Sequence, residues 1–176
     1  MHYLKISTAL LFMLTALLTV SMSNEVHAQT TFVVTSVADN SDFDTGDGVC
    51  DTDDSAGDGP CTLRAAIEQA NATANVDGST PDRIEFDIPG SGPHVIEPTS
   101  FAPDVDEAVV IDGTTEPDYS STPVVVLDGA PNGRNFWLFR RGSGSTVRGL
   151  AVVGFNNQGI NLGGDGGHTV AACYVG

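Results

Sequence analysis

Basic residues are scarce in this chain, and lysine is almost missing from it. The 176 residues include seven Lys and Arg against 23 Asp and Glu, for a net charge of −16, and Lys5 is the only lysine. Nucleic acids and anionic membranes attract proteins that carry a basic footprint, so the composition excludes both as expected partners. The excess of acid suits solubility or cation binding instead.

Long apolar stretches are missing too, except at the N-terminus. Residues 6–20 are apolar apart from Ser and Thr, follow Lys5, and precede the small-residue pattern Val26-His27-Ala28. This predicts a secretory signal peptide over residues 1–28, because the run is short for a spanning helix of about 20 apolar residues. We expect a secreted or cell-surface protein with no membrane span in the mature chain.

Cysteine is limited to three residues. Cys50 and Cys61 bracket a short loop, and export makes a disulfide between them chemically reasonable. Cys173 is left over, and its place in the apolar pattern predicts a small buried hydrophobe.

An acidic segment, residues 39–58, holds eight aspartates with glycines between them. Such a segment cannot form a core, so we expect a solvated loop. Its oxygen ligands also allow a Ca²⁺ site, although the spacing is not that of an EF-hand. Both interpretations stay open, and no other cofactor is expected. The candidate ligands are Asp42, Asp44, Asp47, Asp51, Asp53, Asp54 and Asp58.

A 23-residue spacing recurs towards the C-terminus. It relates Val124, Val147 and Val170; Leu127, Leu150 and Cys173; and the pairs Trp137/Ile160 and Phe139/Leu162. Short β-branched segments broken by glycine occupy each interval, which predicts about three strands per repeat. We therefore expect an all-β fold, a right-handed parallel β-helix (solenoid).

One amphipathic helix is expected, at residues 62–74. Leu63, Ala66, Ile67 and Ala70 form a single apolar face, and Thr62 can act as N-cap. The strands expected around it cover residues 31–38, 83–88, 94–96, 108–113 and 124–129. We divide the mature chain into a capping region that contains this helix, residues 29–90, and the start of the β-helix, residues 91–176.

The run CTLRAAIEQAN, residues 61–71, resembles the CSLREA domain of bacterial secreted and surface proteins. Cys61, Leu63, Arg64 and Ala66 match the family pattern, whereas Thr62 replaces Ser and Ala65 replaces Glu. The flanks TFVVTSVAD, GVCD and RIEFDIPG are also similar. The resemblance implies an N-terminal module followed by a parallel β-helix. It implies no set of catalytic residues.

Three functions compete. The first is a non-catalytic secreted or surface module for adhesion or matrix contact, with polysaccharide or cell-surface components as partners. The second is a pectate lyase-like polysaccharide lyase or hydrolase, which needs a carboxylate cluster and a base. The third is a calcium-binding extracellular module.

The repeats offer few groups for catalysis. Only Asp128 and Asp165 supply acids there, with Arg148 and His168 as candidate bases. Because Arg148 shares its register position with Ala171, we expect no stacked row of functional groups, and we assign no catalytic residue. We also expect the β-helix to continue beyond Gly176.

Overall fold

The structure is a computed structural model of the chain. It describes residues 29–54, 57, 59–75, 80–101, 103–130, 137–139, 142–156 and 158–176. The expected signal peptide, residues 1–28, and the candidate ligand Asp58 lie outside the described residues.

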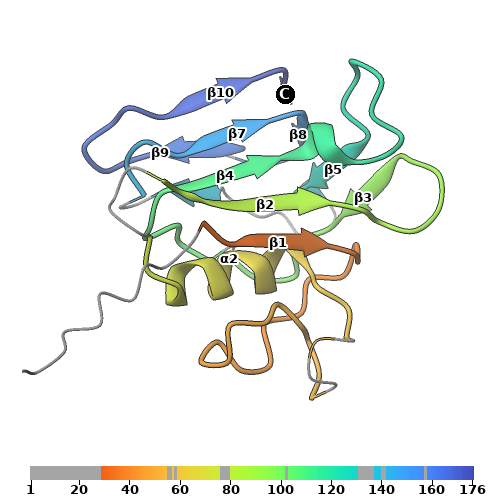
Figure 1. Cartoon of the computed structure of the whole chain (residues 1–176). Helices are drawn as coiled ribbons and strands as arrows, with labels where there is room; N and C mark the ends of the chain where they lie inside the picture. The colour runs from red at the N-terminus through yellow and green to blue at the C-terminus, as the bar shows by residue number, and fades with distance from the viewer. Residues whose placement is uncertain are drawn as a thin grey trace, which may run out of the picture.

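The described strands form three parallel sheets (Figure 1). The five-stranded sheet contains, in order, β1 (Thr31–Val34), β2 (Asp82–Phe86), β4 (Val109–Asp112), β7 (Thr146–Arg148) and β10 (Thr169–Ala171). The four-stranded sheet has the order β11 (Tyr174–Val175), β8 (Leu150–Val153), β5 (Val125–Asp128) and β3 (His94–Ile96). The third sheet pairs β6 (Trp137–Phe139) with β9 (Ile160–Leu162).

The expected right-handed parallel β-helix is wrong. Over the described residues the sheets remain separate and do not close into a solenoid, and with the helix α2 (Leu63–Ala72) they make an arrangement of the α/β type. Irregular spacing between paired strands is the reason. Asp112 of β4 pairs with Arg148 of β7, 36 residues along the chain, so no single repeat length runs through the sheets.

The 23-residue spacing is confirmed where the chain does repeat. Val147 pairs with Val170, Trp137 with Ile160, and Phe139 with Leu162. The spacing fails one step earlier, because Val147 pairs with Ile111 on its other side and Leu127 pairs with Val152 rather than Leu150. The expected rows through Val124 and Leu127 are therefore wrong.

Helix α2 begins where the sequence indicates. Thr62 is its N-cap, with Oγ1 accepting a hydrogen bond from Ala65 N at 3.0 Å, and the helix ends at Ala72 with Thr73 as its C-cap. Such a cap satisfies one of the backbone N–H groups that a helix start leaves unpaired. Figure 1 shows α2 beside β1, at the opposite end of the five-stranded sheet from β10. The helix packs against β1 and β2.

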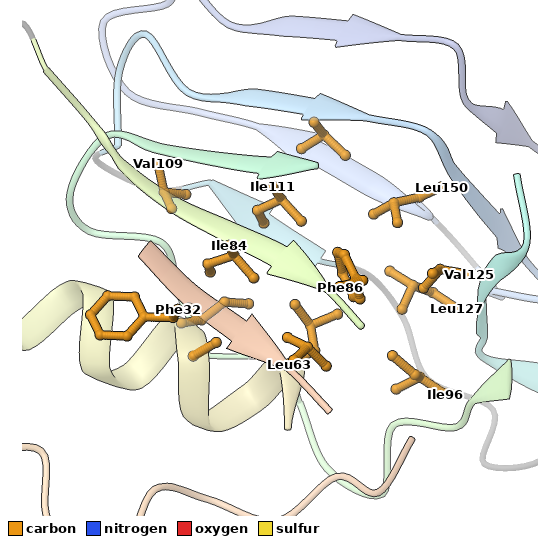
Figure 2. Packing of buried hydrophobic residues seen from close by; sticks show 14 of the residues in the cluster. Phe32, Leu63, Ile84, Phe86, Ile96, Val109, Ile111, Val125, Leu127 and Leu150 are labelled. Atoms are coloured by element: carbon orange, nitrogen blue, oxygen red, sulfur yellow. The ribbon is translucent and has the colours of Figure 1, made fainter. Parts of the chain in front are cut away.

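The core lies where the sheets and α2 meet (Figure 2). Alternate residues of β1 and β2 point inward, as the period of two for side chains along a strand requires. Phe86, Leu63, Ile84, Ile111, Leu127 and Leu150 are among the largest side chains that are almost fully buried. Burial of this apolar surface provides the main favourable free energy of the fold.

The expected disulfide between Cys50 and Cys61 is present. It joins the acidic segment to the residue before the N-cap of α2, and Cys61 also belongs to the core. Cys173 is free and packs against the core, but it is only partly buried, whereas the sequence predicted a buried residue. The disulfide therefore fixes one end of the acidic segment to the body of the protein.

Candidate functional site

The aspartates of the acidic segment hold its backbone turns. Asp42 Oδ1 accepts from Asp44 N at 3.0 Å, Asp44 Oδ1 from Gly46 N at 3.0 Å, and Asp47 Oδ1 from Val49 N at 2.8 Å. Each bond closes a turn between residue i and residue i+2, which is the usual role of aspartate in loops. Several carboxylates of this segment therefore stabilise its backbone turns.

The remaining candidate ligands lie in different surroundings. Asp51 is 2% exposed, which corrects the expectation of a wholly solvated loop, and its Oδ2 accepts from Gly57 N at 2.9 Å. Asp53 and Asp54 are exposed. Across the part of the chain that the structure describes, no three His, Cys, Asp or Glu side chains are grouped so that they could hold a metal ion. The structure does not bring the candidate ligands that it describes, all but Asp58, together as one set.

Asp42 differs from its neighbours in its electrostatics. Burial raises the pKa of its carboxyl group to about 6, and the nearby charges of Asp47 and Asp51 act in the same direction. Backbone N–H donors from Asp44 and Asp51 oppose part of this shift. Asp42 Oδ2 is buried and has no hydrogen-bond partner.

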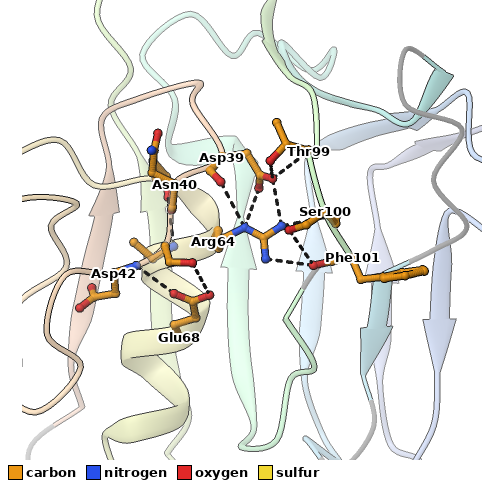
Figure 3. A network of polar contacts seen from close by, with 11 residues as sticks. Asp39, Asn40, Asp42, Arg64, Glu68, Thr99, Ser100 and Phe101 are labelled. Atoms are coloured by element: carbon orange, nitrogen blue, oxygen red, sulfur yellow. Dashed lines mark hydrogen bonds and ion pairs between the residues drawn. The ribbon is translucent and has the colours of Figure 1, made fainter.

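Arg64 is the centre of a polar network that the sequence pattern does not show (Figure 3). Its guanidinium donates to both carboxylate oxygens of Asp39, from Nε at 3.0 Å and from Nη2 at 2.9 Å. It also donates to the carbonyl oxygens of Ser100 and Phe101. Both charged side chains are only 8% exposed. A bidentate pair of this kind is strong and directional.

The same network reaches a third segment of the chain. Asp39 Oδ2 also accepts from Thr99, through both its N at 2.6 Å and its Oγ1 at 2.9 Å. Arg64 and Asp39 therefore join α2, the start of the acidic segment and residues 99–101. A cavity of about 10 Å³ next to them is lined by Asp39, Leu63, Arg64, Ile96, Pro98, Pro103 and Leu127. That volume accommodates one water molecule, not a substrate.

A second charged cluster lies on the five-stranded sheet, and it joins a residue of the expected repeats, Arg148, to residues that precede them. Asp112 of β4 accepts from Arg83 of β2 at 3.0 Å and from Arg148 of β7. Its other oxygen, Oδ1, accepts from Thr114 N and Oγ1. The sequence comparison could not find this cluster, because it covered residues 124–176 and compared only positions 23 residues apart. Arg148 does pair with Ala171 on its other side.

Asp112 is not arranged as a catalytic acid or base. Its side chain is 1% exposed, and although burial opposes the effect, hydrogen bonds from Arg148 and Thr114 hold the pKa of its carboxyl group below the usual value. The hydrogen bond to Asp112 in turn raises the pKa of Arg148. Arginine must lose a proton before it can act as a base, and the raised pKa makes that loss harder.

The other groups considered for lyase chemistry are engaged locally. Asp128 Oδ1 accepts from Ala130 N at 2.9 Å, as a turn residue does. Asp165 is exposed and its N–H donates to Ser143 Oγ at 2.8 Å. His168 Nε2 lies 2.8 Å from the carbonyl oxygen of Gly163. None of these contacts joins an acid to a base.

Three further ionisable side chains are buried: His94, Glu116 and Asp82. His94 Nε2 lies 3.4 Å from Glu116 Oε1, and Glu116 Oε2 accepts from Ile88 N at 3.0 Å, so the pair links β3 to the end of β2. Asp82 accepts from Thr30 N at 2.8 Å, and burial raises the pKa of its carboxyl group. These side chains connect backbone segments to one another rather than lining a cavity.

No known family, curated protein or solved structure matches this chain. In the described ranges, no helix has the length and apolar character needed to cross a membrane.

Proposed function

We propose that the chain is a non-catalytic extracellular module that contacts polysaccharide or other cell-surface components. The state of Asp112 is the observation that carries the proposal. It is the acid that bridges Arg83 and Arg148 on the sheet, and it is buried and saturated by these two arginines and Thr114. The other acid of the cluster, Glu85, is paired with Arg83 at 2.9 Å. A catalytic carboxylate must reach a substrate or exchange a proton with it.

The disulfide supports the extracellular part of the proposal. Disulfides persist in oxidising compartments, and the Cys50–Cys61 bond closes a loop within the capping region. The likeness of residues 61–71 to the CSLREA pattern agrees with a surface module. The candidate bases also argue against a lyase, since Arg148 is bound to Asp112 and His168 to a backbone carbonyl.

We expect the chain to release no unsaturated uronate from pectate or alginate in Ca²⁺ buffer, because the carboxylate that holds Arg148, Asp112, is buried and already bound to Arg83 and Thr114. The measurement is ultraviolet absorbance over time against a no-protein control. A second arm measures retention of the protein on a panel of insoluble polysaccharides.

Activity that disappears in Arg148→Lys would make the chain a lyase and overturn the proposal. Arg83→Lys provides the matched control, because it changes the other arginine bound to Asp112. Retention on at least one polysaccharide without product release is the expected result. Absence of both binding and activity across the panel would also contradict polysaccharide contact.

A further inference from the structure

The five-stranded sheet turns one row of side chains away from the core. Val33, Glu85, Asp112, Arg148 and Ala171 lie in register across its five strands. Val33 is 41% exposed and the side chain of Arg148 is 43% exposed, so solvent reaches this outward face. In Figure 1, α2 lies along the β1 edge of the sheet rather than over this face. The row spans about 19 Å, long enough for a chain molecule to lie across it.

Two arginines on the outward face share one carboxylate oxygen. Arg83 Nη2 lies 3.0 Å from Asp112 Oδ2, and Arg148 Nη2 contacts the same atom. A common contact atom places the two guanidinium groups side by side. The Nη1 nitrogens of both arginines have no hydrogen bond to a described residue, and only Arg148 Nε is buried without a partner. Both Nη1 groups are therefore free to donate to a molecule on this face.

The chemistry of the outward face favours an anionic oxygen as the acceptor. A guanidinium presents its donors in a plane that matches the two oxygens of a carboxylate. Stacking on an aromatic ring, the other common way to hold a sugar, is not offered by the described residues of this face. Apart from its charged residues, the face consists of Thr31, Val33, Val110, Thr146, Thr169 and Ala171.

The charge of the whole chain limits which anion fits. The net charge is −16, and within the cluster Glu85 and Asp112 balance the two arginines. A densely charged polymer is therefore repelled by the rest of the protein. Salt screens most of the interaction between exposed charges more than about 8 Å apart. A polymer whose carboxylates are separated by neutral sugars keeps most of its charge beyond that distance from the acidic surface.

We propose that the outward face of the five-stranded sheet binds an acidic polysaccharide whose carboxylates are separated by neutral sugars, with Arg83 and Arg148 donating to one of these carboxylates. This inference rests on the proposed function and gives its ligand class and its site. Asp112 and Glu85 hold the guanidinium groups in place and do not contact the ligand.

Calorimetric titration of the protein with two forms of one pectin tests the site. In the first form most carboxylates are methyl esters and a few are free, and in the second all are esterified. We expect binding of the first form, and binding at least about tenfold weaker for the second form and for Arg148→Gln and Arg83→Gln with the first. Circular dichroism checks that each variant folds. Arg83→Gln remains informative if Arg148→Gln does not fold, because Asp112 keeps its bonds to Arg148 and Thr114.

Two acidic variants separate the site from the effect of net charge. Glu85→Gln removes the carboxylate that competes for Arg83, so we expect at least about twofold tighter binding. Asp54→Asn removes an exposed charge of the acidic segment, and we expect a change of less than about twofold. An equal gain in both variants would mean that net charge alone sets the affinity, and it would overturn the proposal.

The pectin titration also distinguishes this site from the proposed function. Equal binding of both pectin forms, or binding that both arginine variants leave unchanged, would overturn the site while polysaccharide contact stood. Absence of binding to either form, with retention on another polysaccharide of the panel, would do the same. Absence of binding to every polysaccharide would remove the proposed function together with the site.

Discussion

Replacing Arg64 with methionine is expected to lower the free energy of unfolding by about 3–5 kcal/mol. The substitution keeps an unbranched side chain but leaves Asp39 as a buried charge without its bidentate partner. It also leaves the carbonyl oxygens of Ser100 and Phe101 without that donor. Equilibrium unfolding in urea, followed by circular dichroism, measures the change.

Arg83→Met is the matched control for this prediction. Arg83 is 26% exposed, and its partner Asp112 keeps its bonds to Arg148 and Thr114, so we expect a loss of about 1 kcal/mol or less. The double variant Asp39→Asn with Arg64→Met should lose less than the sum of its single changes, because it leaves no unpaired charge. Equal losses in Arg64→Met and Arg83→Met would contradict the structural role of Arg64.

Gly149→Ala is expected to cost about 3 kcal/mol or more, because strain and overpacking act at the same position. Gly149 has a φ of +70° between β7 and β8, and an added Cβ would lie 2.6 Å from Thr114 Cγ2 and 2.7 Å from Thr114 N. The backbone of the short helical turn η1 (Gly113–Thr115) cannot move away without disturbing Asp112, its N-cap. Thermal and urea unfolding report the loss.

Gly144→Ala separates the two causes. Gly144 has a similar φ of +82°, but nothing lies within 4 Å of an added Cβ. It therefore measures the cost of the backbone conformation alone, about 1–2 kcal/mol. If both alanine variants lost the same stability, the close packing of the β7–β8 turn on η1 would not matter, and the register of β4 against β7 would need revision.

Local features of the fold could be predicted from the sequence. The N-cap at Thr62, the apolar face of α2 and the Cys50–Cys61 bond depend on residues close together in the chain, and all three are confirmed. The closed β-helix was wrong because a 23-residue spacing in the last part of the chain was extended to the whole. Before residue 146, the number of residues between paired strands depends on the lengths of the connecting loops. These lengths do not repeat along the chain.

The polar networks could not be predicted from residues that lie close together in the sequence. Arg64 meets Asp39 and residues 99–101 only because the fold brings these three segments together, and nothing in their sequence spacing indicates it. Likewise Asp112 and Arg148 are 36 residues apart, outside the repeat that guided the search. The acidic segment could be located, but which of its aspartates form turns and which are buried depends on the folded conformation of the segment.

Helix α2 and the disulfide-linked acidic segment form a structural cap that closes the β1 end of the five-stranded sheet. Amide hydrogen exchange tests this most directly, because exchange reports how far each strand is protected from local opening. Both β1 and β10 are edge strands, but α2 packs against β1 whereas the residues of β10 are exposed. We predict that the amides of β1 exchange on the order of tenfold or more slowly than those of β10, close to the rates in β4. Exchange in β1 as fast as in β10 would show that α2 and the acidic segment do not close this edge.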